Sequence, residues 1–411
     1  MTDASTVIPE SDADGPPNYP MPRVNRCPFD PAPALQELQA KEPISRVRLW
    51  DGSTPWLVTH YADLRALYSD PRLSVDKTDP HYPHEGAAHK ERRHEYQMFL
   101  FWNDPEHAAQ RRMVTAPFTI KRVEAMRPAI QKIVDGLIDD MLVGPKPADL
   151  VEALALPVPS LVICELLGVP YEQHAAFQAD SRAIMTRGTP PQEGVEATQR
   201  LVDLMDRLIG EKIAKPGNDL LSELAAKVTS GEVTRREAAT LGVVMLIAGH
   251  ETTGNMIALG TLALLQHPDQ LAIMRDADDP KVVAGSVEEL LRYLTIVGAR
   301  RRFAVADIEV AGQVIHAGDG VIMAQEAGDR DPAAFPDPGR LDLLRGARNH
   351  IAFGYGPHQC LGQPLARVEL QVVYPTLLRR FPELRLAADL DQIPLKNDTT
   401  AYGVYELPVI W

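Results

Sequence analysis

The residues most able to do chemistry stand in a glycine-rich stretch, FGYGPHQCLG, at positions 353–362. Its cysteine, Cys360, leads into LGQPLARVELQVVYPTLLRRF, where apolar residues recur at helical spacing. A cysteine at the start of a helix lies near oriented N–H groups and the positive end of the helix dipole, and both favour the thiolate. The stretch therefore indicates a metal ligand or a nucleophile.

Four interpretations of Cys360 are open. A buried structural thiol needs only apolar neighbours. A thiol nucleophile needs a histidine base, but His358 is two residues away, where side chains in a tight loop diverge. Zinc needs three or four ligands, and the sequence has no second Cys or His pair at zinc spacing. Haem ligation needs one thiolate, glycines that let a flat macrocycle approach and an aromatic ring, which are available as Phe353, Gly354, Gly356, Cys360 and Gly362.

The stretch FGYGPHQCLG resembles the haem-binding signature of the cytochrome P-450 superfamily at every fixed position. The resemblance extends over nearly the whole chain and is closest to soluble bacterial members typical of actinomycetes. It implies a mainly α fold with small β-sheets, and haem b (heme b, iron protoporphyrin IX) between a long central helix and the helix after the cysteine loop. Cys360 would bind the iron, and Phe353, Gly354 and Gly362 would pack against the haem.

A second motif, AGHETT, occupies residues 248–253 inside a long apolar segment. Its His-Glu pair begins a zinc H-E-x-x-H pattern, but position 254 is Gly and the pattern is incomplete. The Thr252 hydroxyl can bond the carbonyl of Ala248, four residues back, and bend the helix. The resemblance implies that this bend forms an oxygen pocket beside the haem, where Thr252 and Glu251 deliver protons.

An E-x-x-R pattern is present at Glu289 and Arg292, although this pattern alone carries little information. Glu124 and Arg127 match it too, and we interpret them as a solvated helix pair. The resemblance implies that Glu289 and Arg292 form a buried network with Arg340, from FPDPGR, that braces the cysteine loop. Breaking such a network would leave a buried charge unpaired.

His107 and Arg111, in DPEHAAQRR, are four residues apart and share one helix face. By itself this spacing is typical of a surface pair. The resemblance implies that the same face binds the haem propionates, together with Arg302 and His358. Four donors or cations for two carboxylates provide the charge balance that a buried dianionic edge needs.

Helices must position most of these residues. The periodicity predicts them over 105–118, 121–143, 148–168, 171–186, 194–214, 218–229, 234–267 and 280–295, with another after Cys360. The segment 234–267 has a T-x-x-E capping box at Thr234 and Glu237, and Pro268 ends it. Strands are expected at 44–50 and 54–60, around Asp51-Gly52, and within 301–318, whereas 72–103 is a long irregular stretch. The order lacks the strand–helix alternation of a doubly wound sheet.

Composition narrows the class of protein. The 411 residues are 45% hydrophobic and carry a formal net charge of −14, which argues against a nucleic-acid surface. Three scattered cysteines predict no disulfide framework and fit the cytoplasm. The apolar run 243–265 contains His250 and Glu251, so it predicts a core helix and no membrane span. We expect a flexible polar segment at 1–30 and a single catalytic domain at 31–411, present as a monomer.

The resemblance implies a monooxygenase that inserts one oxygen atom into a hydrophobic small molecule. The sequence has no G-x-G-x-x-G fingerprint after a strand and no C-x-x-C pattern, so electrons must come from another protein. The resemblance implies that this protein is a small ferredoxin fed by a ferredoxin reductase. Two alternatives remain: a haem-thiolate enzyme that uses peroxide or nitric oxide, and a non-catalytic haem ligand sensor. Candidate ferredoxin-docking cations are Arg112, Lys121, Arg122, Arg345, Arg348 and Arg367.

By family position, the substrate pocket would be bordered by residues 80–100, 184–193, 296–300 and 400–402. The candidate lining residues are Val244, Ile247, Ala248, Val297 and Thr400. Their mainly apolar character favours a hydrophobic substrate, but the sequence does not choose among classes of such molecules.

Overall fold

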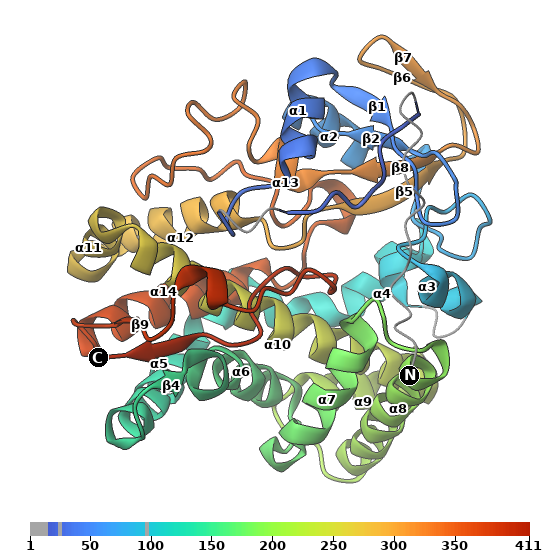
Figure 1. Cartoon of the computed structure of the whole chain (residues 1–411). Helices are drawn as coiled ribbons and strands as arrows, with labels where there is room; N and C mark the ends of the chain where they lie inside the picture. Colours follow the sequence, from blue (N-terminus) through green and yellow to red (C-terminus); the bar gives the residue numbers. More distant parts are fainter. Residues whose placement is uncertain (1–14, 24–26, 95–97) are drawn as a thin grey trace, which may run out of the picture.

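The computed structural model describes residues 15–23, 27–94 and 98–411, which form a helical protein with small β-sheets (Figure 1). The α-helices are α1 (Pro33–Lys41), α2 (Tyr61–Tyr68), α3 (Ala87–Glu91), α4 (Glu106–Thr115), α5 (Ile120–Val143), α6 (Pro157–Leu167), α7 (His174–Met185), α8 (Pro191–Ala214), α9 (Leu220–Ser230), α10 (Arg235–Gln266), α11 (Pro268–Asp276), α12 (Pro280–Leu294), α13 (Gln325–Gly328) and α14 (Gln363–Arg380). The strands are β1 (Ile44–Arg46), β2 (Trp56–Val58), β3 (Leu73–Ser74), β4 (Ala148–Asp149), β5 (Arg300–Ala304), β6 (Ile308–Val310), β7 (Gln313–Ile315), β8 (Gly320–Met323), β9 (Arg385–Leu386) and β10 (Pro408–Ile410).

Helix α10 is the central element. Its 32 residues begin at a complete capping box between Thr234 and Glu237, as the sequence predicts. At about 1.5 Å per residue it is about 48 Å long. It packs against α6, α8 and α14, and nearly all its residues from Ala238 to Leu264 are buried. Apolar residues around the whole circumference are what a fully buried helix requires. No helix within the described part of the chain is long and apolar enough to cross a membrane.

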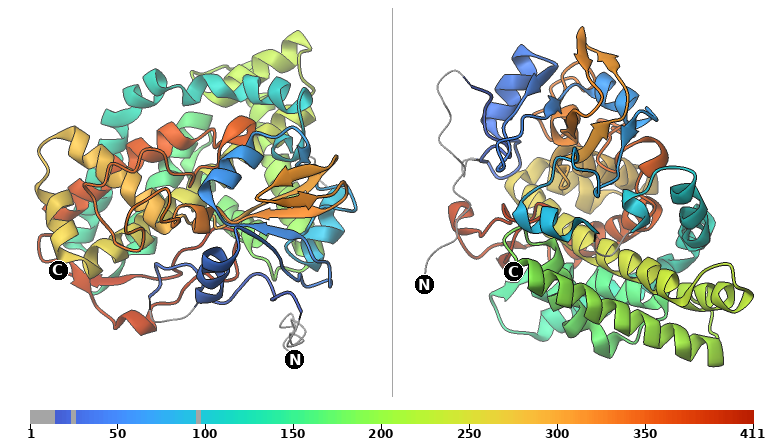
Figure 2. Two further views of the ribbon diagram at one scale, coloured as in Figure 1. Left: turned by 90° about the horizontal axis from the view of Figure 1, so that it is seen from above. Right: turned by 90° about the vertical axis from the view of Figure 1, so that its right-hand side faces the viewer.

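A five-stranded sheet lies beside the helices, with strand order β1-β2-β8-β5-β3. The predicted pairing of β1 with β2 is confirmed, with Ile44 opposite Val58 and Gly52 in the left-handed region (φ 80°) of the connection. Strand β5 lies between β8 and β3. Because side chains alternate along a strand, Arg300 and Arg302 share one face of β5 and Arg301 lies on the other. Figure 2 shows the blue and orange strands of this sheet on one side of the molecule and long helices on the other.

Several predicted boundaries need correction. Pro268 does end α10, but it also begins α11, because proline is well accommodated in the first turn of a helix. The helix predicted over 148–168 is instead β4, a π-helical turn at Val151–Ala155, and α6. The sequence predicts that residues 1–30 are flexible, but Tyr19 and Met21 near the end of that segment are buried in a core cluster with Leu35. Residues 1–14 and 24–26 of that segment lie outside the described residues.

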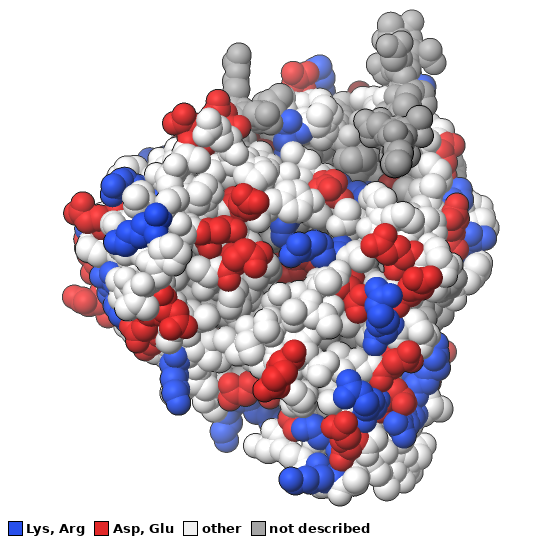
Figure 3. All heavy atoms as spheres, turned by 60° about the horizontal axis from the view of Figure 1, so that its bottom comes forward, with Lys and Arg blue, Asp and Glu red and all other residues white. Residues whose placement is uncertain are grey.

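Basic and acidic side chains are interspersed on the face shown in Figure 3, which therefore has no extended surface of one sign.

Candidate active site

The cysteine loop is held in shape by its glycines. The Cys360 N–H donates to the Phe353 carbonyl at 2.9 Å, closing the loop just before α14. Gly354 and Gly356 both have positive φ, 70° and 72°. A Cβ on Gly356 would lie 2.7 Å from the main-chain oxygen of Tyr68 in α2, so only glycine fits there. The loop thus presents the Cys360 sulfur in a fixed position.

The Cys360 thiol is surrounded by positive charge. Burial raises its pKa, while the Gly362 N–H and the guanidinium groups of Arg300, Arg111 and Arg367 act in the opposite direction. The sequence argument from the helix terminus alone is therefore wrong about the net direction, because desolvation of the thiolate outweighs the nearby positive charges. A metal cation at the sulfur would supply the missing charge.

His358 is poorly suited to act as the base that a nucleophilic Cys360 would need. The His358 ring stacks on His107, with ring centroids 4.0 Å apart. Burial and the neighbouring cations lower the pKa of His358 to about 3. A histidine with so low a pKa accepts a proton from a thiol poorly. Within the described ranges, no three His, Cys, Asp or Glu side chains are placed to share a metal ion, so this part of the chain has no zinc cluster.

The four predicted propionate ligands come together from three elements. Helix α4 contributes His107 and Arg111, β5 contributes Arg302, and the cysteine loop contributes His358, whose pKa responds to the charges of the other three. His107 Nδ1 bonds Asp104 Oδ1 at 3.0 Å, but its buried Nε2 has no partner.

The two arginines of this cluster are fixed through main-chain oxygens. Arg111 donates to the Gln359 carbonyl at 2.6 Å, and Arg302 donates to the Arg301 carbonyl at 2.8 Å. Burial lowers the pKa of both guanidinium groups. Cations held in this way can receive an anionic ligand without rearranging.

The middle of α10 is accessible on one face. Ala248 is exposed and Thr252 is half-exposed, although Val244, Ile247 and Glu251 beside them are buried. Ala248 and Thr252 lie one turn apart on the same helix face. The Thr252 hydroxyl donates to the Ala248 carbonyl at 2.8 Å, as the sequence predicts.

Glu251 has a partner that sequence reasoning missed. The Lys396 ammonium lies 3.6 Å from its carboxylate and donates to Asn255 Oδ1 at 2.8 Å. Burial raises the pKa of Glu251, while Lys396 and Arg182 oppose that rise. In the sequence IPLKN, Lys396 stands between Leu395 and Asn397, and this local pattern does not indicate the contact. The Glu251 carboxyl group is therefore buried, has a raised pKa and is tied to the C-terminal segment.

The E-x-x-R network is present, with one correction. Glu289 and Arg292, both fully buried, form two hydrogen bonds of 2.7 and 2.8 Å. The second guanidinium comes from Arg345, whose Nε lies 3.1 Å from Glu289, and not from Arg340. The Arg340 side chain is exposed, and its carbonyl accepts from Arg345 at 2.9 Å. The tight turns of FPDPGR aim the Arg340 carbonyl inward, with Asp337 at φ 48°. Glu124 and Arg127 form the predicted solvent-exposed pair.

Three of the six candidate docking cations are paired with carboxylates. Arg345 belongs to the Glu289 network, and Arg367 binds Glu288 at 2.6 Å with its guanidinium 4.6 Å above the Phe353 ring. Arg122 pairs with Glu223 at the surface. The remaining candidates, which are exposed, are Arg112, Lys121 and Arg348.

Several predicted pocket segments do meet. Met185 at the end of α7 accepts from the Thr400 N–H at 3.2 Å, and Thr186 pairs with Thr399 in a β-bridge. Val297 is half-buried, and its carbonyl accepts from Gln325 at 2.5 Å. Gly328, where the family often has Asn, is explained by packing: a Cβ there would lie 2.5 Å from Leu64.

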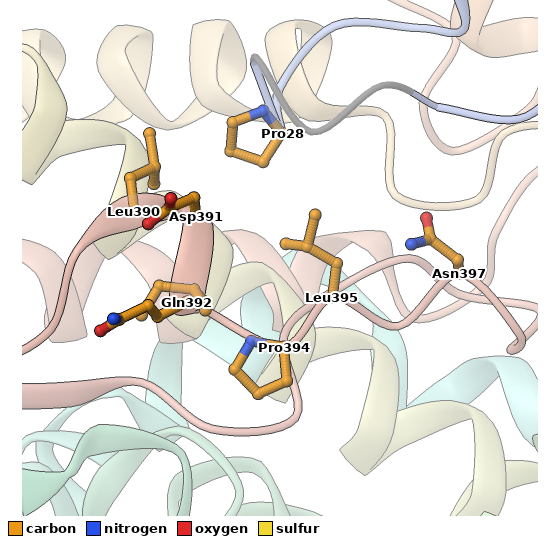
Figure 4. Close-up of a pocket in the computed structure, with 8 residues that line it drawn as sticks. Pro28, Leu390, Asp391, Gln392, Pro394, Leu395 and Asn397 are labelled. Carbon is orange, nitrogen blue, oxygen red and sulfur yellow. The ribbon is translucent and has the colours of Figure 1, made fainter.

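Two surface hollows lie apart from these residues. One, of about 610 Å³, is lined by Pro28 and by residues 390–395 and 397 (Figure 4). The other, of about 760 Å³, lies between the end of α10, α11 and β9. Neither contains any of the predicted site residues.

Comparison with known proteins gives consistent matches over the whole chain. The profile of a family described as Cytochrome P450 matches residues 191–404. Cytochrome P450 GfsF of Streptomyces halstedii is 55% identical over 100% of both chains. Pentalenic acid synthase of Streptomyces avermitilis is 48% identical over 95% of this chain and 96% of that protein. The structure of a mycinamicin VIII C21 methyl hydroxylase from Micromonospora griseorubida, bound to mycinamicin VIII, has a TM-score of 0.90 at 39% identity, covering 96% of this chain and 100% of the other.

Proposed function

The chain belongs to the cytochrome P450 family, and we propose that it hydroxylates a hydrophobic secondary metabolite with electrons from a ferredoxin and its reductase. The single observation that carries this proposal is the position of Cys360, fixed beside a cluster of cationic donors. We assign residues 18–411 to one catalytic domain, because Tyr19 and Met21 belong to its core.

The residues present fit haem b. Haem b carries two propionate carboxylates. The Nε2 of His107, which has no partner among the described residues, and the guanidinium groups of Arg111 and Arg302 could bind them. The exposed Ala248 in an otherwise buried helix leaves room for a flat ring. Nothing lies within 4 Å of a Cβ built on Gly354, which leaves further room beside the cysteine loop.

When bound, a thiolate-ligated haem supplies one-electron chemistry and activation of dioxygen. The residues of the chain bind, orient and control protons around it. Cys360 Sγ would hold the iron, and Arg111, Arg302, His107 and His358 would hold the carboxylates. Phe353 would pack beside the thiolate, with its ring fixed by Arg367.

Proton control is assigned to α10. The Thr252 hydroxyl donates its one proton to the Ala248 carbonyl, so its oxygen is free to accept from a water or ligand beside the helix, and it donates there only when it leaves that carbonyl. Burial raises the pKa of Glu251 above that of an ordinary glutamate, so its carboxylate holds a proton more readily and suits a role in proton transfer. Val244 and Ile247, buried on the same helix, would exclude bulk water and contact apolar substrate.

The substrate class rests on the relatives. One is a pentalenic acid synthase, and one structural neighbour is a mycinamicin VIII C21 methyl hydroxylase. We therefore assign this chain to secondary metabolism, with a hydrophobic small molecule as substrate. A reducing cytoplasm fits the three free cysteines.

The ferredoxin would dock through the exposed cations Arg112, Lys121 and Arg348. Turnover with a ferredoxin should fall steeply as ionic strength rises, because docking of an acidic partner is screened by salt. Turnover that does not change with salt would contradict this assignment, while peroxide-driven turnover serves as the control that needs no docking.

The experiment that tests the function is a carbon monoxide difference spectrum of the reduced, haem-loaded protein, followed by oxygen uptake with a surrogate ferredoxin and reductase. A red-shifted Soret band with substrate-dependent oxygen uptake is expected. Cys360→Ala should lose the band, whereas the matched control Cys27→Ala, at a half-buried free thiol, should keep it. The band with peroxide-driven turnover and no oxygen uptake would favour the peroxide-using alternative, and the band with no turnover would favour a sensor.

A further inference from the structure

One partly buried carboxylate connects segments that are far apart in the sequence. Glu85, between β3 and α3, accepts from Arg187 Nε at 3.0 Å and pairs closely with Arg301 Nη1. Arg187 belongs to the α7–α8 turn, and Arg301 to β5. We call these three residues the Glu85 clamp.

The two arginines of the clamp are held unequally. The Arg301 side chain is 8% exposed and stands on a strand paired on both sides, with Arg301 opposite Ile322 of β8. The Arg187 side chain is 30% exposed and stands on a turn. The Glu85–Arg301 pair is therefore the anchored half of the clamp, and the Glu85–Arg187 pair is the half that can release.

Arg187 brings a further segment into the clamp. Its Nη1 donates to the Asn397 carbonyl at 3.0 Å, and its main-chain N–H donates to the Asp398 carbonyl at 2.9 Å. Thr186 bridges Thr399 beside them. The α7–α8 turn and the segment 397–400 are thus connected to β5 through one carboxylate. The sequence predicts that this turn, within 184–193, and Thr400 border the substrate pocket.

The negative charge of Glu85 holds the two arginines of the clamp together. Burial opposes its ionisation, but Arg301 and Arg187 outweigh that cost and lower the pKa of Glu85 to about 2. The clamp carries two positive charges and one negative. Without the negative charge, two guanidinium groups that now contact the same carboxylate would repel each other across a half-buried site.

We propose that Glu85 is a positioning residue for substrate entry: it holds the α7–α8 turn and the segment 397–400 against β5, and the pocket opens when its contact with Arg187 breaks. This inference rests on the proposed function and on the predicted pocket borders at 184–193 and 400–402. It goes beyond that function in naming the group that controls access.

The test compares Glu85→Gln, Arg187→Met and the double variant in the haem-loaded protein. The probe is 4-phenylimidazole, a bulky haem ligand, and cyanide is the small control ligand that needs no wide opening. Glu85→Gln should raise the association and dissociation rates of 4-phenylimidazole by on the order of 30-fold, the effect of breaking a buried charge pair. Cyanide rates should stay within about twofold.

The double variant tests whether Glu85 acts by holding two arginines together or only by contacting Arg187. Arg187→Met keeps the Glu85–Arg301 pair, so it should raise the 4-phenylimidazole rates less than Glu85→Gln does. Adding Arg187→Met to Glu85→Gln should lower the rates again, because it removes the repulsion between the guanidinium groups. Additive effects of the two substitutions, or unchanged rates in Glu85→Gln, would overturn the proposal.

Hydrogen exchange keeps this inference distinct from the proposed function, because it needs no haem chemistry. Amides of residues 185–190 and 397–400 should exchange faster in Glu85→Gln, with little change in Tm. Arg200→Met is the matched control, since Arg200 pairs with Asp180 and ties α7 to α8 without touching the clamp. If the amides of these segments exchange equally fast in Glu85→Gln and Arg200→Met, or if Glu85→Gln lowers the stability of the whole protein, Glu85 has a merely structural role and the proposal is overturned. Failure of the carbon monoxide spectrum would overturn the proposed function alone.

Discussion

Replacing Arg345 by Met should destabilise the protein far more than replacing Arg340 by Met. Arg345 donates to Glu289 at 3.1 Å, to the carbonyls of Asp337 at 3.0 Å and Arg340 at 2.9 Å, and to Pro336. Arg340 contributes its main-chain carbonyl to this network, and no contact of its side chain with the network is seen within the described residues. Since methionine at position 340 keeps that carbonyl, the two substitutions form a matched pair.

The magnitude follows from the partners that remain. After Arg345→Met, Glu289 keeps two bonds from Arg292 and one from the Asp342 N–H at 3.0 Å, so its charge is not left unpaired. The loss is the bond to Glu289 and those to the carbonyls, each contributing about 1 kcal/mol. For these four bonds we therefore expect about 4 kcal/mol less unfolding free energy. Removing one partner of the buried Glu289–Arg292 pair would cost a similar amount, about 3–5 kcal/mol.

The assay is urea unfolding of the haem-loaded protein, followed by far-UV circular dichroism and by the Soret band, together with the rate of haem transfer to a scavenger protein. Arg345→Met should lower the urea midpoint and speed haem loss, while Arg340→Met should leave both near the wild-type values. Equal damage from the two substitutions, or damage from Arg340→Met alone, would refute the assignment of the second guanidinium.

Three further outcomes follow from buried charges. Lys396→Met should leave Glu251 protonated to higher pH, so the product formed per NADPH should fall at neutral pH and recover as pH rises; Lys396→Arg should preserve it. Glu369 is buried with an unpartnered oxygen and a pKa raised by burial, so Glu369→Met should unfold at higher urea, by a margin that grows as pH rises above about 4.5. Burial raises the pKa of Asp329 to about 6, so the stability that its protonated form contributes is complete below about pH 4 and is lost as the pH rises through 6. Asp329→Asn should remove this pH dependence, a total change of about 3 kcal/mol in the free energy of unfolding.

The cysteine loop and the central helix could be predicted in detail from the sequence because their signals are local. Glycines at 354 and 356 report positive φ directly, and Thr234 and Glu237 cap their own helix. The E-x-x-R pair is likewise local, because residues three apart on a helix meet regardless of what surrounds them.

Contacts between distant segments could not be predicted in this way. Arg340 and Arg345 are both arginines near the same turn, and only the backbone path decides which side chain reaches Glu289. Lys396 and Arg367 read as ordinary charged residues in the sequence, yet one reaches Glu251 and the other Glu288.

The sequence by itself therefore determined the family, the iron-ligand candidate and the elements that carry them, because each depends on residue types at short fixed spacings. The tertiary structure decided which charges are paired across the molecule, including Glu85 with Arg187 and Arg301. The physical reason is that a buried charge must find its counter-charge wherever the folded chain places one, and that place is not encoded in the spacing around either residue.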